Sequence, residues 1–260
     1  MNLELNNKHV LVCGSTAGIG KATAIALANE GAIITLIARN EEKLKTTLSE
    51  LPQQRKHNYI VADFSNPIEL KEKVKAFIIE NHGFHILINN TGGPAGGSVY
   101  SADLEEFEKA FTQHLKCNHV LAQTLVPFMK DEGFGRIINV ISTSVKQPLD
   151  GLGVSNTIRG AVANWSKTLA NELGSFGITV NNVLPGATST ERLSEIIKNK
   201  SGKTGKSIEE SANAMKNTIP AKRFAKPEEL ADAITFLVSK RASYINGINL
   251  PVDGGRTKSL

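Results

Sequence analysis

The chain has 260 residues, 40% of them hydrophobic, and a net charge of +5 at pH 7. This length suits one large α/β domain, and no change of composition marks a second one, so we treat residues 1–260 as a single domain. The basic residues are spread along the chain without interleaved aromatic residues, which argues against nucleic-acid binding.

Targeting and metal-binding signals are not evident in the sequence. The start, Met1 to Leu5, lacks the basic and apolar regions of a secretory signal. The most apolar windows, such as 32–38, fall well short of the roughly 18 residues that cross a bilayer. Neither Cys13 nor Cys117 has a metal or redox spacing, and the histidines form no ligand pattern. We therefore expect a cytoplasmic protein without a disulfide, a metal or a membrane segment.

Short apolar runs rich in β-branched residues alternate with amphipathic stretches, which is typical of βαβ units on a parallel sheet. The predicted strands are 9–13, 32–38, 58–62, 85–89, 135–141, 179–183 and 249–252. Helical patterns between them include 20–29, 41–50 and 67–80. The order predicts a Rossmann-type α/β fold, a doubly wound sheet of seven parallel strands with helices on both faces.

One polar stretch interrupts this rhythm between Pro185 and Pro220, where Lys, Ser, Asn and Gly are frequent. It follows a strand at its carboxyl end, which is where ligands bind in such sheets. We interpret residues at about 187–218 as a mobile lid. The alternative is a solvated surface excursion without a role.

A glycine-rich turn follows the first predicted strand and opens a helix. Gly14 suits the tight turn, Gly18 lets the backbone approach a pyrophosphate, and Gly20 permits close packing of helix and strand. Ser15 and Ile19 lie within the same turn. The free N–H groups and the positive dipole end of the helix would then hold the phosphates.

The end of the second predicted strand indicates which dinucleotide fits. A site for NAD places Asp or Glu here to hold the ribose hydroxyls, but this chain has Ala38 followed by Arg39. A guanidinium without a carboxylate favours a 2′-phosphate, and hence NADP(H). The alternative for Arg39 is a surface residue that pairs with Glu41 or Glu42.

The spacing of Gly14, Gly18 and Gly20 resembles that of the short-chain dehydrogenase/reductases, and the similarity extends over nearly the whole chain. The resemblance implies further cofactor contacts after the third, fourth and sixth strands, namely Asp63, Asn90, Pro185, Gly186 and Thr190. Within the family, the sequence is most similar to the 3-oxoacyl-carrier-protein reductases. It implies a small-molecule or acyl-thioester substrate and a homotetramer.

The catalytic positions of the family are altered in this chain. Ser142 lies at the position of the family's serine. The Tyr-x-x-x-Lys pair is replaced by Ser155 and Arg159, and the family's asparagine by His114. In the resembling enzymes the tyrosine protonates the substrate oxygen, and the lysine lowers its pKa from about 10.

These replacements leave the proton donor open. A serine hydroxyl is a far weaker acid than tyrosine, and arginine cannot relay protons. His114 is the favoured donor, because imidazole titrates near about pH 6.5. Tyr100, in the loop after Asn90, is an alternative. Arg159, one turn after Ser155, would hold the nicotinamide ribose or an anionic substrate.

Two functions remain compatible with the sequence. The first is an NADP(H)-dependent oxidoreductase acting on a carbonyl/alcohol pair with a non-standard acid. The second is a cofactor-binding protein without turnover, acting as a sensor of NADPH or as a scaffold subunit. For the expected tetramer, small residues on the helix after Ser155 (Gly160, Ala161 and Ala163) suit close helix packing.

Overall fold

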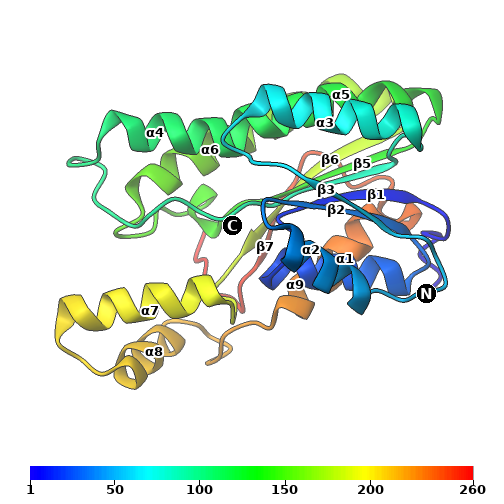
Figure 1. The fold of residues 1–260 in the computed structure, drawn as a ribbon. Helices are drawn as coiled ribbons and strands as arrows, with labels where there is room; N and C mark the ends of the chain where they lie inside the picture. The colour runs from blue at the N-terminus through cyan, green and yellow to red at the C-terminus, as the bar shows by residue number, and fades with distance from the viewer. Residues whose placement is uncertain (260) are drawn as a thin grey trace.

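Seven parallel strands form one sheet at the centre of the computed structural model, which describes residues 1–259 (Figure 1). The strands pair in the order β3-β2-β1-β4-β5-β6-β7. Their bounds are β1 His9–Cys13, β2 Ile33–Ala38, β3 Asn58–Val61, β4 Ile86–Asn89, β5 Gly135–Val140, β6 Ile178–Pro185 and β7 Asn249–Val252. The predicted seven-stranded parallel sheet is confirmed, and the first and last strands have the predicted bounds.

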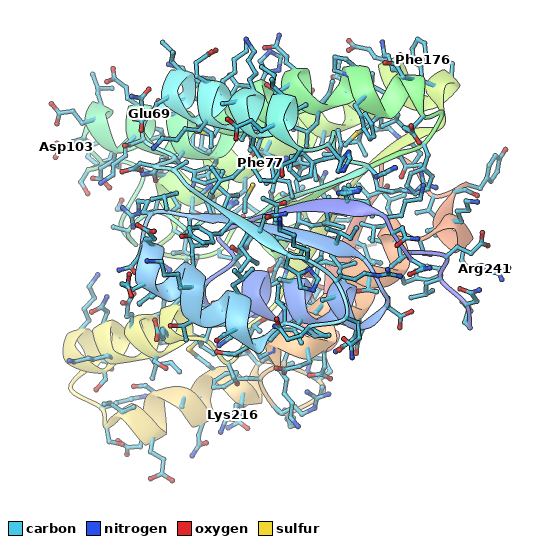
Figure 2. All side chains as sticks on the ribbon, turned by 45° about the vertical axis from the view of Figure 1, so that its right-hand side comes forward. Glu69, Phe77, Asp103, Phe176, Lys216 and Arg241 are labelled. Atoms are coloured by element: carbon cyan, nitrogen blue, oxygen red, sulfur yellow. The ribbon has the colours of Figure 1, made fainter. Side chains whose placement is uncertain are left out.

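Helices cover both faces of the sheet, as the doubly wound prediction requires (Figure 1). On one face lie α3 (Pro67–Glu80), α4 (Leu104–Phe111), α5 (Cys117–Asp131) and α6 (Gly153–Leu173), and on the other α1 (Gly18–Asn29), α2 (Glu41–Glu50) and α9 (Pro227–Val238). Each layer encloses its own apolar core against the sheet. Phe77 of α3 packs against the core between this helix layer and the sheet (Figure 2). Its ring stacks on that of Phe84, with the ring centroids 5.6 Å apart.

The strand order reverses between β1 and β4, which pair with each other. The other neighbour of β1 is β2, and the other neighbour of β4 is β5. In doubly wound sheets, such a reversal marks the crevice that binds ligands at the carboxyl ends of the two strands, here β1 and β4. The glycine turn after β1 and the segment after β4 both open onto that crevice.

Four asparagines stand in register across neighbouring strands and tie one half of the sheet together. Asn89, Asn139, Asn182 and Asn249 are paired residue to residue in β4, β5, β6 and β7. Their amides donate in sequence, Asn89 to Asn139 at 2.8 Å, Asn139 to Asn182 at 3.0 Å and Asn182 to Asn249 at 2.8 Å. Buried amides need such partners, and the ladder fixes the register of the strands that carry the site.

Segment 187–218 forms two helices that project beyond the sheet, α7 (Glu191–Thr204) and α8 (Ile208–Asn217) (Figure 1). A small apolar cluster of Ala187, Leu193, Ile197 and Ile219 holds them to the following loop. Figure 2 shows Lys216 at the surface of this unit, close to the end of α8. The segment is therefore a helical hairpin with a core of its own, and its mobility stays a prediction.

Both cysteines are free and buried within the sheet and its helical cover. The Cys117 thiol donates to the carbonyl oxygen of Phe64 at 3.0 Å. Burial raises the pKa of Cys117 to about 12, and the pKa of Cys13 is raised for the same reason. Both thiols are therefore protonated at neutral pH and act as packing groups.

Within residues 1–259, no helix has both the length and the apolar character needed to cross a membrane.

The small residues expected at a subunit contact on α6 face different ways. Gly160 is exposed, and a Cβ placed on it would meet no atom within 4 Å. Ala163 is only 7% exposed and packs inside its own subunit beside Val162. The prediction that Ala163 helps to form an outward packing surface is therefore wrong, because the helix turns that residue toward the sheet. Gly160 remains available for such a contact.

Candidate active site

The glycine turn has the backbone geometry that its sequence predicts. Gly14 and Gly18 have φ of +57° and +52°, a region that favours glycine. A Cβ on Gly14 would lie 2.5 Å from the carbonyl oxygen of Asn90, and one on Gly20 would lie 2.3 Å from that of Gly14. The turn therefore packs backbone against backbone, and no side chain blocks the start of α1.

The start of α1 is suited to an anion. Ala17, the N-cap residue, provides no side-chain oxygen, and the first turn of the helix has no acidic residue. The N–H groups at this end and the helix dipole consequently remain available for a phosphate. This cradle is the part of the site that fits a dinucleotide pyrophosphate.

Three neighbours brace the turn from inside. Asn90 donates from Nδ2 to the carbonyl oxygens of Cys13 at 3.3 Å and Gly14 at 3.2 Å, which ties the end of β4 to the turn. Ser15 is buried, and its hydroxyl donates to Ile37 O at 3.5 Å. Ile19 packs against the core. The side chain of Ser15 therefore points into the protein, and that of Ile19 is partly buried against the core.

Arg39 lies exposed directly after β2 and has no hydrogen bond or ion pair within the described part of the chain. The acidic residues that follow it have other partners. Glu41 accepts from Tyr59 at 2.9 Å and pairs with Lys45 at 3.2 Å, while Glu42 pairs with Lys45 at 3.1 Å. The alternative in which Arg39 pairs with Glu41 or Glu42 is therefore not found.

Asp63 follows β3 at the same edge of the sheet and is half-buried. Its Oδ1 accepts the backbone N–H of Ser65 at 2.9 Å, which fixes the direction of the carboxylate. Asp63 thus lies on the β3 side of the crevice, as the resemblance implies.

The residues after β6 close the opposite side of the crevice. Pro185 ends the strand, and a Cβ on Gly186 would lie 2.6 Å from Asp253 Cα, so a side chain does not fit there. Thr190 caps α7 by accepting from Leu193 N at 3.3 Å. Its methyl group lies 3.0 Å from the position of a Cβ on Gly18. The turn after β1 and the loop after β6 therefore meet across the crevice.

Two hydroxyls lie at the positions that the resemblance assigns to catalysis. Ser142 is half-buried after β5 and caps a 3₁₀ turn (Thr143–Val145), where its Oγ accepts from Ser144 N at 3.0 Å. Ser155 is half-buried in the first turn of α6 and has no hydrogen-bond partner for its hydroxyl among residues 1–259. Helix α6 packs against the turn that Ser142 caps.

His114 lies in a π-helical turn, Thr112–Lys116, between α4 and α5. It is 1% exposed, and its Nδ1 lies 2.6 Å from the hydroxyl oxygen of Thr91. Burial, and secondarily the charge of Arg159, lowers the pKa of His114 to about 2. The expected titration near pH 6.5 is therefore wrong, and the imidazole is neutral at physiological pH. Its buried Nε2 has no partner in the described chain.

Thr91 was not recognised from the sequence as a site residue. The family motif has alanine where this chain has Thr91, and it has asparagine where this chain has His114. The two departures from the pattern are in contact. Reading them together would have suggested a pair.

Arg159 is 7% exposed, and its Nη1 donates to Val140 O at 3.2 Å. Burial, and secondarily the charge of Arg192, lowers the pKa of Arg159 to about 10. The guanidinium therefore keeps its charge at neutral pH although it is almost wholly enclosed.

Arg192, in the first turn of α7, is a second cation that sequence reasoning missed. It donates to the carbonyl oxygen of Pro94 in the glycine-rich loop after β4. A Cβ on Gly93 would lie 3.7 Å from Nη2 of Arg192 and 3.9 Å from Nη2 of Arg159. No motif marks Arg192, since its role depends on where the α7 helix returns to the sheet.

Tyr100, the alternative proton donor, is 98% exposed. A phenol that faces solvent on all sides does not provide a positioned acid. The interpretation of Tyr100 as a catalytic residue is not supported by its placement.

These elements define a Rossmann-type nucleotide site at the strand-order reversal of a parallel sheet. His114, Ser155 and Arg159, which depart from the pattern of the resembling enzymes, belong to the neighbouring part of the site. Residues 14–257 match the family model described as enoyl-(acyl carrier protein) reductase. The chain belongs to the short-chain dehydrogenase/reductase family.

Relatives and solved structures agree with that assignment. The chain is 30% identical to an L-xylulose reductase of Caenorhabditis elegans over 98% of this chain and 97% of the relative. It is 31% identical to a 2,3-dihydro-2,3-dihydroxybenzoate dehydrogenase of Bacillus subtilis, over 97% of each. The L-sorbose reductase of Gluconobacter frateurii, solved with NADPH and L-sorbose, superposes with a TM-score of 0.94 at 32% identity over 100% of both chains.

Proposed function

We propose that the protein is an NADP(H)-dependent oxidoreductase that interconverts a carbonyl and an alcohol on a small molecule. The observation that carries the proposal is the unpaired, exposed Arg39 beside an unobstructed phosphate cradle. A free guanidinium at the end of β2 suits a 2′-phosphate. The similar L-sorbose reductase binds NADPH, which supports the same choice.

Bound NADPH would supply hydride to the carbonyl carbon, and the chain must then place a proton on the oxygen. Ser142 and Ser155 offer hydroxyls at the family's catalytic positions. Since His114 is neutral, it would act as a hydrogen-bonding group rather than as an imidazolium acid. If Nδ1 accepts from the Thr91 hydroxyl, the tautomer carries its proton on Nε2. We infer that water supplies the proton through the serine hydroxyls.

A 3-oxoacyl thioester is one substrate compatible with this reading, and a polyol or sugar ketone is another. The resemblance to carrier-protein reductases supports the first. The sugar reductases among the similar proteins support the second. A steady-state assay of NADPH consumption against ketones, sugar ketones and 3-oxoacyl thioesters tests the proposal, and binding of NADPH without turnover of any of them contradicts it.

A second function is favoured by the altered acid site: a cofactor-binding protein without turnover. Tyrosine and lysine are replaced, and His114 holds no titratable proton near neutral pH. In that case NADPH binds and no carbonyl is reduced. Ser155→Tyr combined with Arg159→Lys separates the two functions, because it should confer turnover on a protein that only binds the cofactor.

We also propose a homotetramer, as is usual in this family. The exposed Gly160 on α6 offers a surface where a second helix can approach closely.

A further inference from the structure

Two guanidiniums from different parts of the fold converge on one point. Arg159 reaches it from α6 and Arg192 from the first turn of α7. A single Cβ position, on Gly93, lies within 4.0 Å of nitrogen atoms from both side chains. Gly93 carries no side chain, so the space between the two cations and the glycine-rich loop is left open.

No carboxylate neutralises this pair within the described chain. The side chain of Arg159 donates to the carbonyl oxygen of Val140, and no acidic residue raises its pKa. The nearest carboxylate to Arg192 is that of Glu195, at 4.0 Å. This distance is long for an ion pair, and the Glu195 side chain is 69% exposed. Arg159 is buried, whereas the Arg192 side chain is 40% exposed. A buried cation without a counter-charge is unfavourable, and a second cation beside it adds repulsion, so a bound anion would stabilise the pair.

The position of the pair indicates which anion enters. Arg159 lies one helical turn after Ser155 and next to the strand end that precedes Ser142. His114, whose Nε2 has no partner, also lies near Arg159, because the charge of Arg159 contributes to the lowered pKa of His114. The pair thus borders the place where the reacting carbonyl is expected, beside Ser155 and the end of β5.

We propose that Arg159 and Arg192 bind a carboxylate of the substrate, so that the protein acts on oxo acids and the corresponding hydroxy acids. That the bound carboxylate belongs to a substrate rests on the proposed function, whereas the presence of an anion site does not. Guanidiniums hold carboxylates by paired, parallel hydrogen bonds, which lysine cannot reproduce. Such a role would account for arginine at the position where the family has lysine.

The loop from Gly92 to Gly97 would form one wall of this site. Its far end is tied to the start of α6, since Gly97 N donates to Gly151 O at 2.8 Å and Gly153 N donates to Gly97 O at 3.0 Å. Arg192 holds its middle through Pro94. A bound carboxylate would therefore bridge α6, α7 and this loop.

Calorimetric titration with the full-length protein tests the proposal. The probes are 2-oxobutanoate, acetoacetate and 4-oxopentanoate, each compared with its methyl ester, with and without saturating NADP⁺. We expect at least one acid to bind tenfold or more tightly than its ester. Arg192→Gln should weaken the binding of that acid by about tenfold or more, since a charge-assisted hydrogen bond is lost. Lys198→Gln, which removes the same charge from an exposed position of α7, should bind as the wild type does.

The same titrations distinguish a carboxylate from the phosphates of the cofactor. If Arg192→Gln weakens NADPH and leaves acid binding unchanged, the pair serves the cofactor and the proposal is overturned. Equal binding of acids and esters, or equal loss in the two variants, overturns it as well. Arg192→Lys should recover only part of the affinity. Binding of acids by a protein that reduces none of them would contradict the proposed function while leaving the anion site supported.

Discussion

The hydroxyl oxygen of Thr91 lies 2.6 Å from Nδ1 of His114, which joins the end of β4 to a π-helical turn between α4 and α5. Both residues depart from the family pattern, and they are in contact with each other. π-Helical turns frequently occur at functional sites, and here the turn brings a ring nitrogen within reach of the loop after β4. The pair forms a buried contact in which the imidazole is neutral at physiological pH.

The burial of His114 has a measurable effect on stability. Its folded pKa is about 2, below the unfolded value of 6.5, so between these values the unfolded chain binds a proton that the folded chain does not. The contribution is therefore complete above pH 6.5 and is lost as the pH falls. It amounts to about 1.4 kcal/mol for each pH unit below 6.5.

We expect urea denaturation of the wild type between pH 7.5 and 5.5 to show this loss, and His114→Asn to reduce the slope. His85, with a pKa lowered to about 4, contributes in the same direction and leaves a residual slope in both proteins. His119→Asn, at an exposed position, serves as the control and should keep the wild-type slope. Identical pH dependence in all three would show that His114 is not held neutral by the fold.

Thr91 and His114 should be energetically coupled. Thr91→Ala and His114→Asn each remove one partner of a buried hydrogen bond, so the second replacement costs less than the first. We expect a coupling energy of about 1 kcal/mol in a double-mutant cycle of unfolding free energies. Additive losses would mean that the 2.6 Å contact is not a stabilising bond.

Arg39 should determine the choice of dinucleotide. NADPH is expected to bind more tightly than NADH by about 1.5–3 kcal/mol, the value of a charged hydrogen bond. Arg39→Ala should remove most of that difference in fluorescence titrations. Lys43→Ala removes a neighbouring exposed charge from α2 and should retain it. A wild type that prefers NADH would rule out the 2′-phosphate role.

Assembly can be tested at Gly160. A side chain there has open space in the subunit, so Gly160→Arg should fold as the wild type does while blocking close approach of a second helix. We expect light scattering to show a smaller particle for the variant than for a tetrameric wild type. Gly202→Arg, on α7 with equally open space, is the matched control. A monomeric wild type would contradict the proposed tetramer directly.

The sheet and the cofactor cradle could be predicted because their signals are local. Buried parallel strands read as apolar runs, and the glycines at 14 and 18 are required by positive φ at those positions. The catalytic side depends on distant contacts instead. The pKa of His114 follows from its burial in the folded chain, and Arg192 reaches the loop after β4 only because of where α7 lies in the fold. Neither follows from spacing in the sequence.

The sharpest prediction concerns Ser155 and Arg159. Ser155 is half-buried with a free hydroxyl, so the start of α6 already presents this position to the crevice. Ser155→Tyr combined with Arg159→Lys would restore an acid whose pKa a nearby ammonium lowers from about 10. A positioned general acid is worth about 10²–10⁴ in rate. We therefore expect the double variant to consume NADPH faster than the wild type with neutral ketones.

The control for this gain is Ser155→Phe with Arg159→Lys, which fills the same space without a hydroxyl and should show no increase. Because Arg159 is also proposed to bind the substrate carboxylate, the rate of NADPH consumption should increase less with oxo acids than with neutral ketones. Turnover that appears only in the tyrosine variant would identify the natural protein as a cofactor-binding protein without catalysis. If the wild type turns over and the tyrosine variant is no faster, proton transfer does not limit the reaction, and the serine hydroxyls with neutral His114 suffice.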